Sequence, residues 1–384
     1  MGPSLFGLLA PDTQRVLFST ATSEVIYGFG KVGLVLYVFL MGLEFEPKLI
    51  RENAKTAVSV SVAGILMPFA LGSMVAILLN NRILFPENVP GWQSIFFFGT
   101  AMSITAFPVL ARIISERGLA GTRLGMLALT AGSFDDAAAW CILGVLLALS
   151  NNQPVDAVIT IGGALLYAVA VFTLIRPLLR YLGGIAEKKR YVNASLLSLV
   201  LILLMLGAWF TEMIGIHYVF GAIILGLAVP RGIFARDVQQ FLQPVVMSLL
   251  IPLFFVHSGL NTSIGLVSTF YLWSITLLIL ATASVGKGVA CWAAARLSGE
   301  PNRNAIGIGA LMNARGLMEL IILNIGLERG IITPTLFTIM VIMTAVTTLM
   351  ATPIFEFVYK KSESSTTAGD TEFSVPAYAQ RMGS

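Results

Sequence analysis

The stretch Gly132-Ser133-Phe134-Asp135-Asp136-Ala137-Ala138-Ala139-Trp140 places two adjacent acidic residues near the middle of an apolar run from about Leu124 to Leu149. At about 1.5 Å per residue, a helix over this run is long enough to cross the roughly 30 Å hydrocarbon core of a membrane. A charge at that depth costs at least about 2.5–3.5 kcal/mol, so each carboxylate needs a partner, a water-filled cavity or a proton. We interpret the stretch as a functional site; the alternative is a structural pair on a buried helix face.

Adjacent positions on a helix point about 100° apart, so Asp135 and Asp136 face different partners. An intramembrane aspartyl protease needs two aspartates that converge from different helices on one water. The arrangement in this stretch does not provide that pair, and a dyad sharing one proton is not expected.

The composition is that of a membrane protein. Hydrophobic residues make up 57% of the 384 residues and charged residues 11%, whereas charged residues are about 25% of a typical soluble protein. Such a chain cannot cover itself with polar side chains. Its apolar runs are continuous rather than alternating, which excludes an outer-membrane barrel. We therefore expect an all-α polytopic protein in a lipid bilayer, and the net charge of +4 gives no indication of nucleic-acid binding.

Eleven apolar segments qualify as membrane spans, and the seventh of them is short and rich in glycine. They are Val25–Leu43, Ala57–Leu79, Gln93–Ser115, Leu124–Leu149, Ala157–Leu179, Val192–Glu212, Ile216–Val229, Phe241–Gly259, Thr269–Leu297, Asn304–Leu327 and Pro334–Tyr359. Residues 360–384 form a short polar tail, which we expect to be disordered because it has too few apolar residues to form a core.

Lys and Arg concentrate in every second connection between these spans. The rich connections contain Lys48/Arg51/Lys55, Arg112/Arg117/Arg123, Arg176/Arg180/Lys188/Lys189/Arg190, Arg231/Arg236, Arg296/Arg303 and Lys360/Lys361. By the positive-inside rule these connections and the C-terminal tail are cytoplasmic, and Met1 lies outside. We see no signal peptide before the first span, so an external N-terminus indicates that one or more leading spans are missing from this chain.

Few charged side chains lie inside the predicted spans, and their signs nearly balance. They are Lys31, Lys287, Arg315, Asp135, Asp136 and Glu319. Lys31 lies near one end of its helix and can reach the surface, whereas Lys287 lies at mid-span and needs a partner. We expect Lys287 to pair with one of the two aspartates. We also expect Arg315 to pair with Glu319, one helical turn later.

Two of the spans are interrupted. Pro108 follows a hydroxyl-rich stretch at 100–105, and proline removes a backbone donor from its helix. Asn313 and Gly316 interrupt a second span. Each break alone is compatible with an ordinary kink, but the two occupy matching places in two sets of three spans, the second to fourth and the ninth to eleventh. The offset between the sets is an odd number of spans, so they run in opposite directions. Inverted repeats with paired broken helices commonly form the ion site of a secondary transporter.

These motifs resemble the monovalent cation:proton antiporter-2 family, which includes NapA, Kef-type potassium systems and plant cation/H+ exchangers. The matching segments are residues 2–5 (GPSL), 39–44 (FLMGLE), 103–112 (SITAFPVLAR), 133–136 (SFDD), 252–260 (PLFF and SGL), Lys287 and 313–320 (NARGLMEL). The resemblance implies a NhaA/NapA-like inverted repeat with two crossing broken helices and a homodimer. It divides the sodium/hydrogen exchanger-like domain, residues 1–359, into core helices at about 57–149 and 269–359 and dimerisation or panel helices at about 25–43 and 157–259.

The resemblance also implies roles for the charged residues. Asp136 matches the ion-binding carboxylate, and Asp135 matches the acid that pairs with Lys287. The adjacent Asp-Asp is the pattern of electrogenic members, because plant exchangers and electroneutral relatives have Asn-Asp. We expect the hydroxyls of Thr105 and Ser133 to complete a cation shell around Asp136. The residues expected to support the two breaks are Pro108, Asn313, Arg315, Gly316 and Glu319.

Together these features predict a secondary antiporter that exchanges Na+ or K+ for protons by alternating access. It would be a multi-pass protein of a bacterial inner (plasma) membrane, with no enzymatic activity and no cofactor besides the transported ions. With two protons per cation, the exchange would be electrogenic. A sodium-coupled symporter on the same fold and a cation channel remain as alternatives, although no repeated carbonyl or charge ring of a channel filter is visible. The choice between Na+ and K+ stays open.

Overall fold

The computed structural model of the protein describes residues 7, 10–44, 54–79, 83–119, 122–149, 154–215 and 217–359. Every regular element in these ranges is a helix, which confirms the prediction of an all-α protein. The predicted tail at 360–384 and the segment at 2–5 lie outside the described residues.

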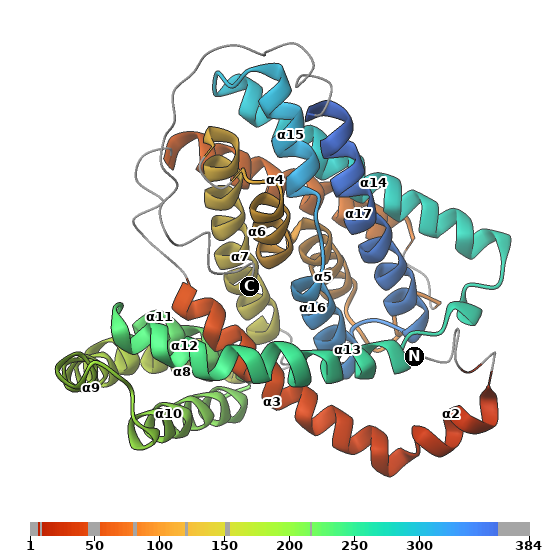
Figure 1. Cartoon of the computed structure of the whole chain (residues 1–384). Helices are drawn as coiled ribbons and strands as arrows, with labels where there is room; N and C mark the ends of the chain where they lie inside the picture. Colours follow the sequence, from red (N-terminus) through yellow and green to blue (C-terminus); the bar gives the residue numbers. More distant parts are fainter. Residues whose placement is uncertain are drawn as a thin grey trace.

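The helices follow the order of the predicted spans (Figure 1). They are α2 (Pro11–Leu17), α3 (Thr20–Glu44), α4 (Ala54–Leu78), α5 (Gly91–Ser103), α6 (Phe107–Glu116), α7 (Arg123–Leu149), α8 (Pro154–Ala170), η1 (Val171–Ile175), α9 (Arg176–Lys189), α10 (Ala194–Met213), α11 (Tyr218–Ala228), α12 (Ile233–Val245), η2 (Val246–Leu250), α13 (Ile251–Leu260), η3 (Ile264–Leu266), α14 (Phe270–Leu297), α15 (Asn302–Met312), α16 (Leu317–Glu328) and α17 (Pro334–Tyr359). Side-chain caps fix five of the starts. In each, a side-chain oxygen accepts from the backbone amide three residues later, at Ser19, Thr122, Asn193, Thr269 and Thr333.

Ten helices or helix runs in the described ranges are long and apolar enough to cross a membrane, and they coincide with ten of the eleven predicted spans. The predicted seventh span corresponds to α11, which has 11 residues and a length of about 16 Å, shorter than the hydrocarbon core is thick. Gly215, at φ 86°, turns the chain before this helix. Val229 is extended at its end, as expected for a residue that precedes a proline.

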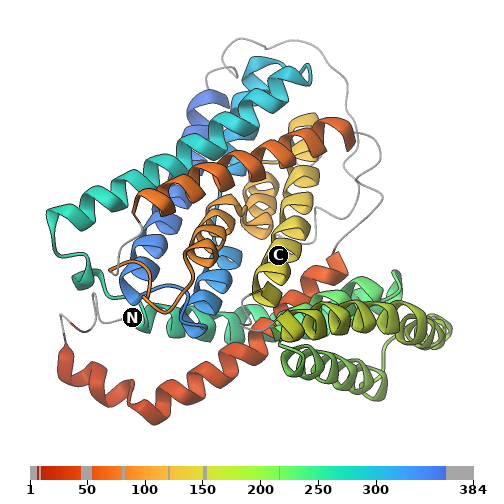
Figure 2. The same ribbon diagram turned by 180° about the vertical axis from the view of Figure 1, so that it is seen from behind.

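The helices pack as two groups. The first group comprises α4–α7 and α14–α17, and its closest pairs include α4 with α14, α4 with α5, and α14 with α15. The second group comprises α3 and α8–α13, in which α3 contacts both α11 and α13. Figure 1 shows the second group across the lower part of the molecule, and Figure 2 shows the same arrangement from behind. Glycine permits the closest approach within the second group, because a Cβ on Gly226 would lie 2.9 Å from Gly42 Cα.

The first group contains the predicted repeat of long helix, broken helix and long helix. The first broken helix consists of α5 and α6, and the second consists of α15 and α16. In Figure 1 the chain runs upward from α5 to α6 and downward from α15 to α16. The two sets therefore run in opposite directions, as the odd offset between them predicted.

Candidate functional site

The two broken helices cross at their interruptions. Between α5 and α6 the chain is extended at Ile104 and Ala106, and the Ala106 amide donates to the Ala314 carbonyl of the other break at 3.0 Å. A Cβ on Gly316 would lie only 2.9 Å from Val109 Cγ2, so the absence of a side chain lets the two breaks approach. The backbone groups that each break frees are thus partly satisfied by the other.

Asp135 lies at this crossing and is surrounded by donors. Its Oδ1 accepts from Ser61 Oγ on α4 at 2.5 Å. Its Oδ2 accepts from Thr105 Oγ1 at 2.5 Å and from Lys287 Nζ at 3.1 Å. The carboxylate and the ammonium are both fully buried as side chains. Both carboxylate oxygens of Asp135 therefore have hydrogen-bond donors, and additional hydrogen bonds of this kind are what a buried ion pair needs to offset its desolvation.

Lys287 also joins the first break to α14. Its ammonium donates to the carbonyl of Ser103, the last residue of α5. The last carbonyls of a helix carry the negative end of its dipole and lack partners within the helix. Lys287 therefore serves two acceptors, the Asp135 carboxylate and the end of the broken helix.

Asp136 has a different environment. Its side chain is 6% exposed, and neither carboxylate oxygen has a hydrogen-bond partner among the described residues. The backbone amide of Phe107, the first residue of α6, lies near this carboxylate but forms no hydrogen bond with either of its oxygens. A buried carboxylate without partners is costly when it is charged, so Asp136 is the position at the crossing where a cation or a proton is needed.

Arg315 and Glu319 form the second buried ion pair of the crossing. Their Nη1–Oε1 distance is 3.0 Å, and both side chains are fully buried. Arg315 also donates to the carbonyls of Ala101 at 3.1 Å and Met102 at 2.6 Å, near the end of α5. The second break thus supplies a cation to the negative end of the first broken helix.

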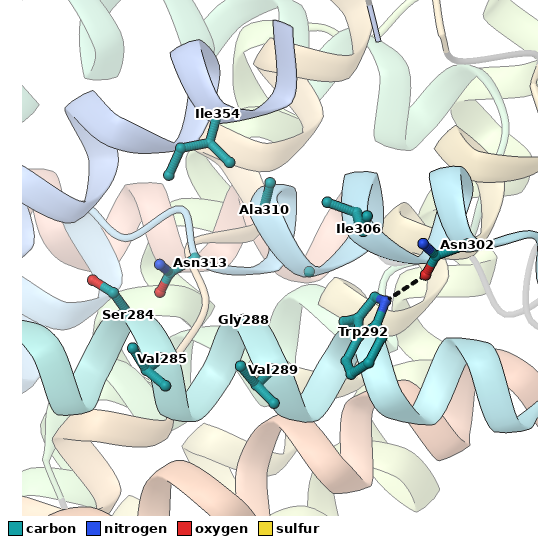
Figure 3. Close-up of a pocket in the computed structure, with 11 residues that line it drawn as sticks. Ser284, Val285, Gly288, Val289, Trp292, Asn302, Ile306, Ala310, Asn313 and Ile354 are labelled. Atoms are coloured by element: carbon teal, nitrogen blue, oxygen red, sulfur yellow. Dashed lines mark hydrogen bonds between the residues drawn. The ribbon is translucent and has the colours of Figure 1, made fainter. Parts of the chain in front are cut away.

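The remaining predicted residues are placed as follows. Thr105 contacts Asp135 rather than Asp136, and Ser133 Oγ donates to the Leu129 carbonyl of its own helix at 2.9 Å. Pro108 lies in the first turn of α6, where its missing amide removes no helical bond. Asn313 lines a groove of about 380 Å³ between α14, α15 and α17 (Figure 3). No hydrogen bond joins it to either aspartate within the described ranges.

Two contributors to the site were not predicted from the sequence. Ser61 donates to Asp135 from α4, but it is one of several serines in that helix and carries no charge that would single it out. Thr348 on α17 accepts from the Arg315 amide and donates to the Arg315 carbonyl, at 3.2 and 2.6 Å. Both lie far along the chain from their partners, and only the packing brings them together.

Replacing Arg315 by Met is expected to destabilise the protein strongly. The change leaves Glu319 buried without its partner and removes the donors to Ala101 and Met102. Breaking a buried pair in this way costs about 3–5 kcal/mol, which thermal unfolding of the purified protein in detergent measures. Adding Glu319→Leu removes the stranded carboxylate and should restore part of the loss. A double variant no more stable than Arg315→Met would show that the ion pair contributes little.

Comparison with known proteins finds one matching family and several similar antiporters. The chain matches the family described as "Sodium/hydrogen exchanger, transmembrane" over residues 1–361. It is 39% identical over 365 residues to the Na+/H+ antiporter NhaS4 of Synechocystis sp., covering 94% of this chain and 88% of that protein. It is 34% identical over 373 residues to cation/H+ antiporter 18 of Arabidopsis thaliana, covering 96% of this chain and 46% of that protein. The chain therefore spans about half the length of the plant relative.

A similar fold is found among solved structures. The sodium proton antiporter MjNhaP1 from Methanocaldococcus jannaschii, determined at pH 8, matches with a TM-score of 0.59 and 17% identity over 90% of this chain and 86% of that chain. At this level of identity the match establishes the fold of the described helices.

Proposed function

Because the chain belongs to the sodium/hydrogen exchanger transmembrane family, we propose that it is a secondary active antiporter that exchanges a monovalent cation for protons across a membrane. Exchange of this kind requires one site that holds either a cation or a proton, but never both. The site must also be reached alternately from the two sides of the membrane.

The charge balance at the crossing carries this proposal. Asp135 is paired with Lys287, and Glu319 is paired with Arg315. Asp136 remains as the buried carboxylate without a partner. An unbalanced charge inside a membrane is costly, so the site is occupied either by a cation bound to the Asp136 oxygens or by a proton on them. Competition between these two ligands for one carboxylate produces antiport.

The cation ligands would come from oxygen atoms close to Asp136. Na+ and K+ are bound by carboxylate, hydroxyl and carbonyl oxygens, and the unwound segments of broken helices offer such carbonyls. Thr105 and Ser133 retain oxygen lone pairs beyond the bonds that they donate, so both remain candidates for the shell. The same chemistry accepts Na+ and K+, and we propose a monovalent cation of either kind.

We further propose that Lys287 carries a second proton, with two protons moved for each cation. Lys287 is paired with Asp135 of α7, and its own helix α14 contains no acidic residue that could replace this partner. Release of its proton when the cation binds would make each cycle move one net charge. A membrane potential then contributes about 2.3 kcal/mol per 100 mV to the exchange.

The proposal also covers the oligomeric state, the membrane and the orientation of the protein. We propose a homodimer in a bacterial inner (plasma) membrane, with the second helix group, α3 and α8–α13, as the dimerisation panel and the first group as the mobile core. The C-terminal side would be cytoplasmic. The transported ions are its substrates, and the only bonds that the cycle makes and breaks are those to the exchanged protons.

Reconstitution into vesicles tests the proposed function. Purified protein is placed in vesicles that enclose a pH indicator, and Na+ or K+ is added outside in the absence of any organic solute. Antiport predicts that protons move in the direction opposite to the cation. A cation gradient should drive proton movement, and a proton gradient should drive cation movement. A symporter would require an organic solute, and a channel would conduct the cation without moving protons. Absence of coupled proton movement with both cations would overturn the proposal.

The topology offers an independent prediction. Asn88, before α5, and Lys188, near the end of α9, are both exposed. The basic-loop alternation places the first outside and the second in the cytoplasm. Single cysteines at the two positions, in a background without Cys141 and Cys291, should therefore react with an impermeant thiol reagent from opposite sides of the membrane. Labelling from the same side would contradict the inverted arrangement of the repeats.

A further inference from the structure

A small polar network joins the two helix groups far from the crossing. Asn324 on α16 donates from Nδ2 to Ser258 Oγ on α13 at 3.1 Å. These side chains are only 4% and 3% exposed. The same amide donates to the Leu320 carbonyl at 2.8 Å. The contact is therefore a buried hydrogen bond between α16 of the core and α13 of the panel. Separating the two helices would leave the Asn324 amide and the Ser258 hydroxyl without this partner.

Lys31 on α3 lies within electrostatic range of Glu328, which is one helical turn beyond Asn324 on α16. Lys31 Nζ on α3 lies 4.3 Å from the Tyr27 ring centroid and 5.6 Å from that of Tyr218, which are cation–π distances. Glu328, at the end of α16, interacts electrostatically with both Lys31 and Tyr27. Tyr27 also packs against the His257 ring at 4.7 Å between centroids. Lys31 is thus held by aromatic rings of the panel, within electrostatic range of the Glu328 carboxylate of the core.

The two residues of α16 that these interactions involve, Asn324 and Glu328, lie on one face of the helix. Asn324 and Glu328 are four residues apart and so lie one above the other on the helix. Leu317 and Leu320, which are buried, continue this face toward the crossing. Because α16 begins directly after the break at Gly316 and has 12 residues, it extends about 18 Å from the crossing. A route to Asp136 that passed between the two groups on this side would have to part α16 from α13, two helices that the Asn324–Ser258 hydrogen bond joins.

We propose that Asn324 with Ser258, and Lys31 with Glu328, form a lock that closes the route to Asp136 on the side where α16 ends. This inference rests on the proposed exchange, in which that route opens once in each cycle. The Asn324–Ser258 bond holds the buried part of the boundary, and Lys31 with Glu328 holds its rim. The four residues act on exchange by setting how often the site opens, and none of them binds the cation.

Accessibility of a cysteine behind the lock tests this proposal without depending on transport. Leu320→Cys is introduced after Cys141 and Cys291 are replaced by Ala. An impermeant charged thiol reagent is then added on the side where the loop at 329–333 lies. Labelling should be slow in this parent and at least five-fold faster after Asn324→Ala or Lys31→Met. Lys31→Arg keeps the charge over the tyrosine rings and should stay within two-fold of the parent.

A matched control breaks an ion pair that lies within the core group. Arg123 on α7 and Glu300, before α15, are 2.7 Å apart, and Glu300→Gln should leave the labelling rate unchanged. Unchanged rates in both lock variants, or equal acceleration in the control, would overturn the lock. Vesicle exchange is measured on the same variants. Faster labelling in a protein that shows no exchange would refute the antiport and retain the lock, whereas exchange with unaltered labelling would refute the lock alone.

Discussion

Replacing Asp136 by Asn is expected to abolish coupled exchange while the protein still inserts and folds. The amide keeps the volume of the carboxylic acid but can neither release a proton nor balance a bound cation. An uncompensated charge in the membrane interior costs at least about 2.5–3.5 kcal/mol, which corresponds to a loss of roughly 100-fold in cation affinity. Cation-driven proton movement in vesicles should therefore fall to the level of protein-free vesicles.

Ser133→Ala tests, in the same assay, the contribution of a neutral oxygen on the same helix. Ser133 lies on the same helix, but its hydroxyl is directed to the Leu129 carbonyl. We expect this variant to keep exchange within a few-fold of the wild type, with a modest change in cation affinity if the hydroxyl enters the shell. Coupled exchange that persists in Asp136→Asn at normal protein levels would remove Asp136 from the site.

Replacing Asp135 by Asn is expected to change the charge moved in each cycle. The variant removes the anion beside the Lys287 ammonium, and a desolvated ammonium without a counter-charge favours its neutral form. Lys287 would then stay neutral throughout the cycle, and Asp136 alone would exchange its proton. Transport should become one proton for one cation and insensitive to voltage. The measurement is cation-driven exchange in vesicles clamped at several membrane potentials.

Ser61→Ala provides the control for Asp135→Asn. It removes one donor to the Asp135 carboxylate but leaves both charges of the pair, so exchange should remain voltage dependent. Because loss of the pair can cost about 3–5 kcal/mol, the amount of folded Asp135→Asn protein is measured alongside transport. A wild type without voltage dependence, or an Asp135→Asn variant that keeps it, would assign Lys287 to a structural role.

The charged contacts of the crossing were largely accessible from the sequence, because buried charges are few. Arg315 and Glu319 are four residues apart on one helix, so local spacing indicates their contact. Lys287 and Asp135 are 152 residues apart, but Lys287 had to find an acid within the membrane and few acids were available. Because an unpaired buried charge is so costly, its partner can be predicted without knowing how the helices pack.

The neutral contacts could not be predicted in the same way. Thr105 was expected beside Asp136, yet it donates to Asp135, because the direction of one hydroxyl depends on how the two breaks cross. The donation from Arg315 to the end of α5 depends on the same crossing. Hydroxyls and carbonyls are numerous in this chain, so each has many possible partners and the sequence alone does not select one.

The breaks themselves and the seventh span show where local sequence suffices and where it fails. Pro108 and Gly316 mark the interruptions correctly. Proline fits the first turn of a helix but not its interior, so a new helix starts at this point. A side chain at position 316 would collide with Val109 of the other break. The seventh predicted span, Ile216–Val229, was already short and rich in glycine. The helix is shorter still, because Gly215 turns the chain before it and Val229, which precedes Pro230, is extended after it. The apolar composition therefore continues beyond the ends of the helix.

Proton release on cation binding tests the central claim most directly, because it requires neither a membrane nor a complete transport cycle. Na+ or K+ is added to the purified protein in weakly buffered detergent solution, and the pH change is recorded at several starting pH values. If one carboxylate holds either ligand, the wild type releases protons on binding, its apparent cation affinity falls as the pH is lowered, and Asp136→Asn releases none. Cation binding without proton release, or equal release from Asp136→Asn, would contradict the account.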